Sequence, residues 1–283
     1  MKFEPAIREI GDRSPYIWGP TPFKDYLAET GQDTSRKTPE FISVDHLEKL
    51  NSSLKNKDIM VLRMGQSEGT GTQFVLIRIE NQINDLFFLD DEIFGLDEPS
   101  PFIPNKKISE LFPFYLFEKL SETNLVNFAF ASGLLSRALS LDNVDQSPIP
   151  ATGSINPTFE FCPHSKIQNV LKHKRGQVQV DGVFLAERNG SQALFVLEAK
   201  VGSSSKTLAK HKLLYSVLAL SDSVPPGIPI CPVYLRVNKA SDGLIFRFAE
   251  IDIADPREET ISLDAIKPIS TQSHKLPNRL SLF

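Results

Sequence analysis

Short runs of β-branched and aromatic residues alternate along the chain with segments in which apolar residues recur at helical spacing. The runs have the composition of strands, because such side chains pack well on a pleated, half-buried surface. They lie at residues 58–64, 73–80, 85–89, 159–161, 230–237 and 244–253. Together with the helical segments between them, these strands predict a mixed sheet that carries helices on its faces.

The helical pattern is clearest between residues 108 and 141, where leucines and phenylalanines fall three or four positions apart. This spacing predicts one long helix, or two shorter helices that meet near Ser121. A second apolar stripe predicts a helix that begins at Ser205, a residue type that caps helix N-termini, and ends at about Ser221. Shorter helices are expected at 44–54 and 165–174, and an irregular connection at 142–157.

Two β-rich runs flank the dipeptide Asn189-Gly190 and form the most informative pattern in the chain. Asn-Gly between such runs predicts a two-residue type I′ turn, because both positions of that turn need a positive φ. Pairing outward from this turn places Asp181 directly opposite Glu198. The two acidic residues therefore share one face of a predicted hairpin.

The same register assigns the neighbouring residues to faces, because side chains alternate along a strand. Gln179 falls opposite Lys200, on the face of the two acids. Val178 and Val180 fall on the other face, which carries only apolar side chains. We therefore expect one face to pack on a core and the other to become polar away from the turn.

Carboxylates on directly paired positions repel each other, since their Cβ atoms are only about 4.5–5.5 Å apart. A divalent cation between Asp181 and Glu198 would relieve this repulsion. Mg²⁺ is typically held by one or two carboxylates together with water and substrate phosphate. The spacing therefore predicts a Mg²⁺ site, with Lys200 as a positive charge beside it.

Charge is distributed unevenly although the net charge is only −4. Residues 164–212 contain nine Lys and Arg against three Asp and Glu, and two of these three acids are Asp181 and Glu198. A basic surface around an acidic pair is typical of a site for a polyanion and a metal. A solvated basic face accounts for the same charges, so charge alone leaves both interpretations open.

Length and composition exclude several classes of protein. A chain of 283 residues accommodates one large domain or two small ones. Its apolar runs are shorter than the roughly 18 residues of a membrane helix, and its first residues lack a signal-peptide core, so we expect a cytoplasmic protein without a membrane partner. Cys162 and Cys231 form no CxxC motif and are expected to be free thiols.

These residues resemble the PD-(D/E)XK nuclease superfamily, which has the restriction-endonuclease-like fold. That family places an acid on one strand and the motif (D/E)-x-K on the next, and here Asp181 and Glu198-Ala199-Lys200 match. The segment from Gly176 to Asp181 is similar to the one that many type II restriction enzyme-like proteins of prokaryotes carry before this Asp. The resemblance covers roughly residues 108–240.

The resemblance implies an α/β (α+β) fold in which helices flank a mixed sheet. Its core order is helix, strand, strand, strand, helix, strand, and we assign it to a nuclease domain at residues 108–283. Residues 1–107 would form an extra β-rich region for DNA recognition or dimerisation.

The implied activity is Mg²⁺-dependent hydrolysis of phosphodiester bonds in double-stranded DNA, most similar to that of a sequence-specific type II restriction endonuclease. Asp181, Glu198 and the backbone carbonyl of Ala199 would hold the metal. Lys200 would orient the attacking water or neutralise developing charge. Gln179 would hold Lys200 in place.

DNA contacts are expected on the helix after the hairpin. Lys206, Lys210, His211 and Lys212 could contact backbone phosphates there, with Lys210 and His211 foremost. A homodimer is expected, because cutting both strands takes two acid pairs and each chain has one. A structure-specific DNA repair nuclease and a catalytically silent DNA-binding relative stay open as alternatives.

A third acid often completes this kind of site in the family. Three residues are candidates for it here: Glu118 and Glu122 in the predicted helix, and Glu160 on the short strand. The sequence does not choose among them.

Overall fold

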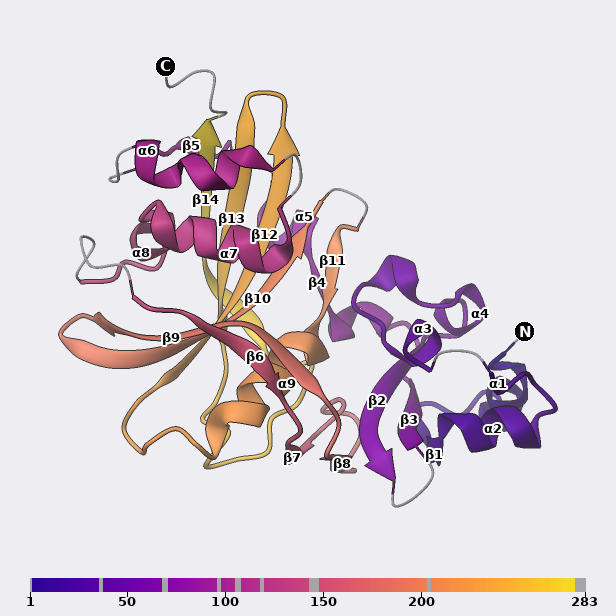
Figure 1. The fold of residues 1–283 in the computed structure, drawn as a ribbon. Helices are drawn as coiled ribbons and strands as arrows, with labels where there is room; N and C mark the ends of the chain where they lie inside the picture. The colour runs from indigo at the N-terminus through magenta and orange to yellow at the C-terminus, as the bar shows by residue number, and fades with distance from the viewer. Residues whose placement is uncertain are drawn as a thin grey trace.

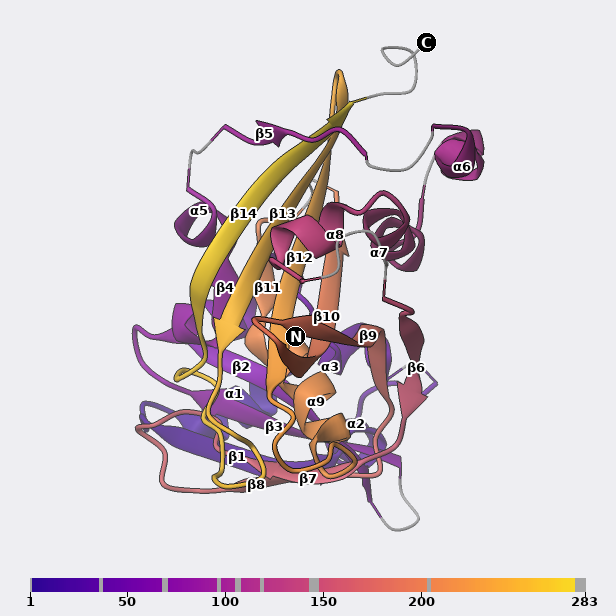
Figure 2. The same cartoon turned by 90° about the vertical axis from the view of Figure 1, so that its left-hand side faces the viewer.

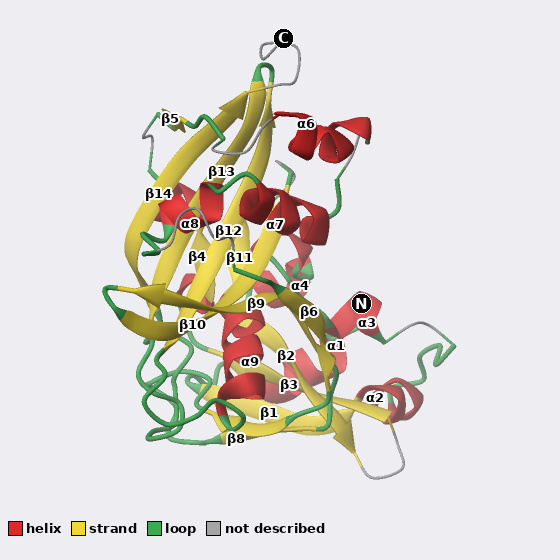
Figure 3. Ribbon diagram, turned by 60° about the vertical axis from the view of Figure 1, so that its left-hand side comes forward, coloured by secondary structure: helices red, strands yellow, loops and turns green. Residues whose placement is uncertain are grey.

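A computed structural model gives the structure of the chain. It describes residues 2–35, 38–67, 71–95, 98–104, 108–117, 120–142, 148–202 and 205–277. Within these ranges the protein is a mixed α/β structure with two main sheets, one of them long and strongly curved (Figures 1 and 2). The helix α9 (Lys210–Ser221) lies between the two sheets (Figure 3).

The larger sheet has seven strands among the described residues. Their order is β5 (Ser100–Pro101), β14 (Lys267–Pro277), β13 (Gly243–Asp252), β12 (Ile230–Ala240), β10 (Ser191–Val201), β9 (Val178–Arg188) and β6 (Ala151–Ile155). Strands β10 and β12 are parallel, and α9 forms the crossover between them, as a parallel pair requires. The β9–β10, β12–β13 and β13–β14 pairs are antiparallel.

Helices cover both faces of this sheet. On one face, α7 (Glu122–Ala131) and α8 (Leu134–Ala138) pack on a core that includes Phe195 and Leu197 of β10. On the other face, α9 packs Val217 against Val196 of β10. Alternate residues of β10 thus serve two cores, and the next position on the α9 face is Glu198.

The smaller sheet combines strands from distant parts of the chain. Its order is β1 (Tyr16–Pro22), β3 (Gly71–Arg78), β2 (Ile59–Ser67), β8 (Leu171–Lys174) and β7 (Thr158–Phe161). A further pair joins β4 (Phe87–Leu89) to β11 (Thr207–Ala209). Backbone pairing therefore connects residues 1–107 to the rest of the chain at several places.

Short helices complete the N-terminal half and the segment before α7. They are α1 (Glu4–Ile10), α2 (Phe23–Glu29), α3 (Pro39–Ile42), η1 (Leu47–Lys49), α4 (Ser52–Lys55), η2 (Ile83–Leu86), α5 (Asp90–Ile93), α6 (Ile108–Leu111) and η3 (Phe112–Leu116). No helix in the described part of the chain is long and apolar enough to cross a membrane.

Most predicted strands are present, whereas the described residues of the segment at 108–141 form neither one long helix nor two, but four short helices, α6, η3, α7 and α8. Strands β2, β3, β4, β7, β12 and β13 fall on the expected runs. Ser121 is the N-cap of α7, and its hydroxyl accepts a hydrogen bond from the Asn124 backbone N–H at 3.2 Å. The mixed sheet with helices on both faces confirms the coarse prediction of an α+β structure.

Four other local predictions are wrong. Residues 165–174 are not helical, because 171–174 pair with β7 as strand β8. The connection at 142–157 contains β6, which pairs with β9. The helix expected from Ser205 begins at Lys210, because Thr207–Ala209 pair with β4. Residues 44–54 form only η1 and the start of α4.

Candidate functional site

The turn of the central hairpin has the predicted geometry. Asn189 and Gly190 have φ values of 55° and 73°, both in the left-handed region that a type I′ turn requires. The predicted register then holds from the Arg188–Ser191 pair to the Gly182–Leu197 pair. This part of the sequence interpretation is confirmed.

Beyond Gly182 the strand β9 leaves β10, and its pairing with β6 shifts register between Val183 and Val180. This β-bulge reverses the alternation of faces. Val180 consequently packs with Val196 on the α9 side, where the sequence had placed acidic and amide side chains. Gln179 is exposed, and its backbone carbonyl accepts a hydrogen bond from Ser216 Oγ at 3.4 Å. The expectation that Gln179 lies opposite Lys200 is therefore wrong.

At the bulge, the side chain of Asp181 replaces a backbone carbonyl as a hydrogen-bond acceptor between the strands. Its Oδ2 accepts the backbone N–H of Ala199 at 2.9 Å, where a strand residue would otherwise offer a carbonyl. Asp181 is buried beside Glu198, and its charge is one of the causes that raise the Glu198 pKa. The structure thus brings the two predicted acids together.

Glu198 is the most deeply buried acid of the site, with 2 % of its side chain exposed. Its Oε1 lies 3.7 Å from the Lys200 ammonium and 3.9 Å from that of Lys212 on α9. Burial raises the pKa of Glu198 to about 7, and the charges of Asp181 and Glu122 add to this, while the two lysines oppose it. Without a further cation the carboxylate is only partly ionised near neutral pH.

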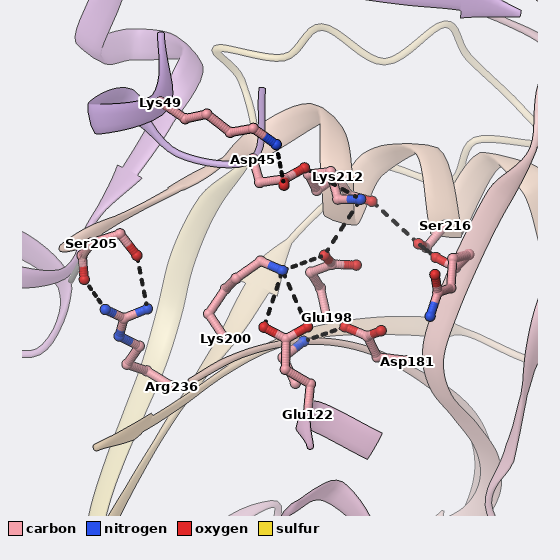
Figure 4. Close-up of polar contacts among 12 residues, drawn as sticks. Asp45, Lys49, Glu122, Asp181, Glu198, Lys200, Ser205, Lys212, Ser216 and Arg236 are labelled. Carbon is pink, nitrogen blue, oxygen red and sulfur yellow. Dashed lines mark hydrogen bonds and ion pairs between the residues drawn. The ribbon is translucent and has the colours of Figure 1, made fainter. Parts of the chain in front are cut away.

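Lys200 lies between two carboxylates (Figure 4). Its Nζ is 3.4 Å from Oε1 and 3.5 Å from Oε2 of Glu122, at the first turn of α7, and 3.7 Å from Glu198. Burial lowers the pKa of Lys200, but the surrounding carboxylates outweigh this and raise it above its usual value. Lys200 therefore stays protonated and acts as a fixed positive charge.

The three candidates for a third acid have different positions. Asp181, Glu198 and Lys200 form a cluster of charged side chains, called the acidic cluster below, and Glu122 joins it through its contact with Lys200. Glu160 lies on β7 in the smaller sheet, where it is exposed and pairs with Lys172 at 2.9 Å. Glu118 lies outside the described residues. Among the described candidates, only Glu122 is placed where it could assist the Asp181 and Glu198 pair.

Asp45 is a member of the cluster that the sequence interpretation missed. Its carboxylate lies 3.1 Å from Lys49 and 3.8 Å from Lys212, so it shares Lys212 with Glu198. Burial tends to raise the pKa of Asp45, but the charge of Lys212 and contacts with Lys49 outweigh it and lower the pKa. Asp45 follows no strand and carries no motif, so only the folded chain places it here.

The predicted DNA-contacting residues have three different environments. Lys206 is exposed and pairs with Asp91 at 3.3 Å. Lys210 is buried, with its ammonium 5.5 Å from the centre of the Phe88 ring. His211 is buried as well, and burial lowers its pKa to about 3. Lys210 packs on Phe88, which argues against its predicted contact with backbone phosphates. His211 and Lys212 line a small cavity beside α9, and Lys212 also faces Glu198.

The donor set of the site fits a hard cation such as Mg²⁺ better than a softer metal, because it consists of oxygen atoms. Asp181 uses only one carboxylate oxygen for its bond to Ala199. Among the described residues no three Asp, Glu, His or Cys side chains converge as a complete ligand group. A metal here would therefore rest on two carboxylates, a backbone carbonyl and solvent or substrate oxygens.

The raised pKa of Glu198 predicts a pH-dependent stability in the presence of a chelator. Between pH 4.5 and about 7 the folded protein retains a proton on Glu198 that the unfolded chain has lost, so stability falls as pH rises through this window. The loss approaches about 3 kcal/mol. His173 and His211, whose pKa values are lowered, act in the opposite direction below pH 6.5.

This prediction is tested by urea unfolding of the wild type and of Glu198→Gln from pH 4.5 to 8. The difference between the two curves isolates Glu198 from the histidines. The wild type should lose stability relative to the variant as pH rises and then level off above about pH 7. A difference that does not change with pH would show that the Glu198 carboxyl titrates normally.

Comparison with known proteins identifies a family for this chain. No curated protein matches it. No solved structure matches it either. A family described as a domain of unknown function, DUF6997, matches residues 97–270, which is more than half of the chain and includes every member of the acidic cluster except Asp45. The chain therefore belongs to the DUF6997 family.

Proposed function

We propose that this protein is a Mg²⁺-dependent endonuclease that hydrolyses phosphodiester bonds in double-stranded DNA. The observation that carries the proposal is the buried pair Asp181 and Glu198 at the open end of the hairpin, with Lys200 two residues further along β10. Two adjacent buried carboxylates are costly to a fold unless they serve a ligand. A sequence-specific restriction enzyme is the form of this activity that the motif favours.

The order of elements supports the same proposal. From α7 onward the chain forms β6, β9, β10, α9 and β12, with α8 inserted after α7, β7 and β8 after β6, and β11 before α9. Without the inserted elements this is the order helix, strand, strand, strand, helix, strand that the resemblance implies. Asp181 and Glu198 lie on its second and third strands.

Each side chain of the cluster has a role that follows from its environment. Asp181 and Glu198, with the backbone carbonyl of Ala199, would hold Mg²⁺. When bound, the ion supplies an activated water and neutralises charge on the scissile phosphate. Lys200 stays protonated, so it donates hydrogen bonds to water or phosphate and does not accept a proton. Glu122 fixes the position of the Lys200 ammonium.

Metal dependence is the direct test of this proposal. We expect the protein to cleave plasmid DNA with Mg²⁺ or Mn²⁺ and to be inactive in EDTA, because the proposed chemistry needs a cation between the two acids. Ca²⁺ should support DNA binding without cleavage. Gel analysis of plasmid forms with each cation decides this, and undiminished cleavage in EDTA would rule out the proposed mechanism.

A silent DNA-binding protein is the second candidate, and one observation favours it. Lys200 and Lys212 already neutralise Glu198, and Lys212 also contacts Asp45, so the cluster has partners without any metal. Such a protein would bind duplex DNA equally well with Mg²⁺ and with EDTA and would cut neither strand.

The number of active sites bears on the oligomeric state, because a restriction-type endonuclease cuts both DNA strands. Each chain contains one Asp181 and Glu198 pair, so we propose a homodimer that places one pair at each strand. Light scattering with and without DNA tests this, and a monomer that cuts both strands together would contradict it.

A further inference from the structure

A small cavity lies next to the acidic cluster, between the smaller sheet and α9. Its volume is ≈ 70 Å³, which is room for a few water molecules or one group of phosphate size. Its polar lining includes Arg63 of β2, His173 of β8, and His211 and Lys212 of α9. Three elements far apart in sequence thus bring four basic or imidazole side chains to one cavity.

Several nitrogen atoms of this lining have no hydrogen-bond partner among the described residues. They are Nδ1 of His173, Nδ1 of His211 and Nε of Arg63. The two histidines are 2 % and 6 % exposed, so partners for these nitrogens have to lie within the cavity. Buried polar groups are nearly always paired, and each unpaired one costs about 1–3 kcal/mol. Three such atoms around one cavity mark a place where a polar ligand can replace water as their partner.

The charge of the lining selects an anion. Arg63 and Lys212 are positive, and Asp45 is the acid that faces the same cavity. Asp45 is shared between Lys49 at 3.1 Å and Lys212 at 3.8 Å, so the excess positive charge of the lining lies on Arg63. Burial lowers the pKa of His173 to about 4 and that of His211 to about 3, so both rings are neutral and offer nitrogen atoms without further charge.

Lys212 connects the cavity to the acidic cluster. Its ammonium lies 3.9 Å from Glu198 and 3.8 Å from Asp45, and the same side chain lines the cavity. Neighbouring phosphates of a nucleic-acid strand could therefore occupy both places at once. Tyr215 completes the wall, with its ring centre 5.2 Å from that of His173 and 5.3 Å from that of His211.

We propose that this cavity is a phosphate subsite, which takes a phosphate group of the DNA strand next to the phosphate held beside Asp181 and Glu198. The inference rests on the proposed nuclease function and adds to it a second point at which the strand is held. Arg63 and Lys212 neutralise the phosphate, and the neutral imidazole of His211 donates a hydrogen bond to one of its oxygens. His173 donates its one N–H to the Pro157 backbone and contributes only to the wall. Arg63 and His211 have no role in the chemistry at the acidic pair, whereas Lys212 serves both places.

The first experiment uses inorganic phosphate as the probe. Imidazole nitrogen signals of His173 and His211 are followed by NMR while phosphate is added at constant ionic strength, with chloride as the control anion. We expect saturable shifts in the wild type and at least tenfold weaker binding in Arg63→Gln and His211→Phe. His173→Phe is the matched control, because it keeps a ring on Phe159, which stacks on His173 with centres 4.6 Å apart, and it should bind phosphate like the wild type. Shifts that do not saturate, or wild-type affinity in both Arg63→Gln and His211→Phe, would overturn the subsite.

The second experiment uses duplex oligonucleotides in which one phosphate at a time is replaced by an uncharged methylphosphonate. One replacement next to the cleaved bond should raise the KM of the wild type at least tenfold. The same replacement should raise the KM of Arg63→Gln much less, because this variant has already lost the contact between Arg63 and the phosphate. Equal sensitivity of the two proteins would contradict a nucleic-acid phosphate in the cavity, even if inorganic phosphate binds there.

The two experiments separate this inference from the proposed function. If the wild type cleaves no DNA, the nuclease proposal fails, and the phosphate titration still decides whether the cavity binds phosphate. If the wild type cleaves DNA, but Arg63→Gln equals the wild type both in phosphate affinity and in its sensitivity to methylphosphonates, the subsite fails and the nuclease proposal stands.

Discussion

Replacing Glu198 by glutamine is expected to lower the rate of Mg²⁺-dependent DNA cleavage by about a thousandfold or more. A thousandfold loss corresponds to about 4 kcal/mol of transition-state stabilisation, which is the scale of metal-ion catalysis. Glutamine has nearly the same shape as glutamate but supplies no negative charge to a cation. Because Glu198 is 2 % exposed and its contacts are ionic, the substitution should leave the packing of β10 intact.

The measurement is single-turnover cleavage of a duplex substrate at saturating Mg²⁺, with circular dichroism to confirm the fold. Glu160→Gln is the matched control, because Glu160 is a sequence candidate for the third acid but lies exposed on β7 beside Lys172. It should cleave like the wild type. If Glu198→Gln cleaves DNA at the wild-type rate, Glu198 is not a catalytic residue, and the nuclease proposal loses its central residue.

Replacing Arg236 by methionine is expected to destabilise the protein by about 3–5 kcal/mol, whatever its function, because it leaves a buried carboxylate without its partner. Arg236 is 2 % exposed, and its Nε lies 3.0 Å from Asp90 Oδ2. Its guanidinium also donates to the backbone carbonyl of Ser205. Asp90 in turn accepts a hydrogen bond from the Tyr234 hydroxyl at 2.7 Å.

Urea unfolding at pH 7 measures this effect, and the surface pair Lys206 and Asp91 provides the control. Both side chains of that pair are largely exposed, so Lys206→Met should change stability by less than about 1 kcal/mol. The double variant Asp90→Asn with Arg236→Met should recover part of the loss, since no charge is then buried alone. If Arg236→Met is as stable as the wild type, the Asp90 contact contributes nothing to the fold.

The sequence predicted the central hairpin because its information is local. An Asn-Gly dipeptide requires a particular turn, and the turn determines the register for several residues on either side. Asn189 and Gly190 have the expected positive φ values, and the register holds as far as Gly182. The same locality explains why the break at Ser121 could be predicted, since a serine N-cap acts within one helical turn.

The remaining features depend on residues far away in the chain. The bulge near Asp181 appears only when β6 pairs with β9, and residues 142–157 show no strand pattern of their own. Lys172 and His173 belong to a strand because β7 lies beside them. Asp45 joins the site through Lys212, which is on a helix more than half the chain away. No periodicity within any one segment carries this information.

The pairing of β8 with β2 and of β11 with β4 has a consequence for how the chain can be divided. If residues 1–107 were removed, β8 and β11 would each lose a neighbouring strand and expose unpaired N–H and C=O groups. Open strand edges of this kind promote edge-to-edge aggregation. We expect residues 108–283 expressed alone to be insoluble, and to recover solubility when residues 1–107 are supplied as a separate polypeptide in the same cell. A soluble, monomeric 108–283 fragment would show that these residues fold independently of the strands they share with residues 1–107.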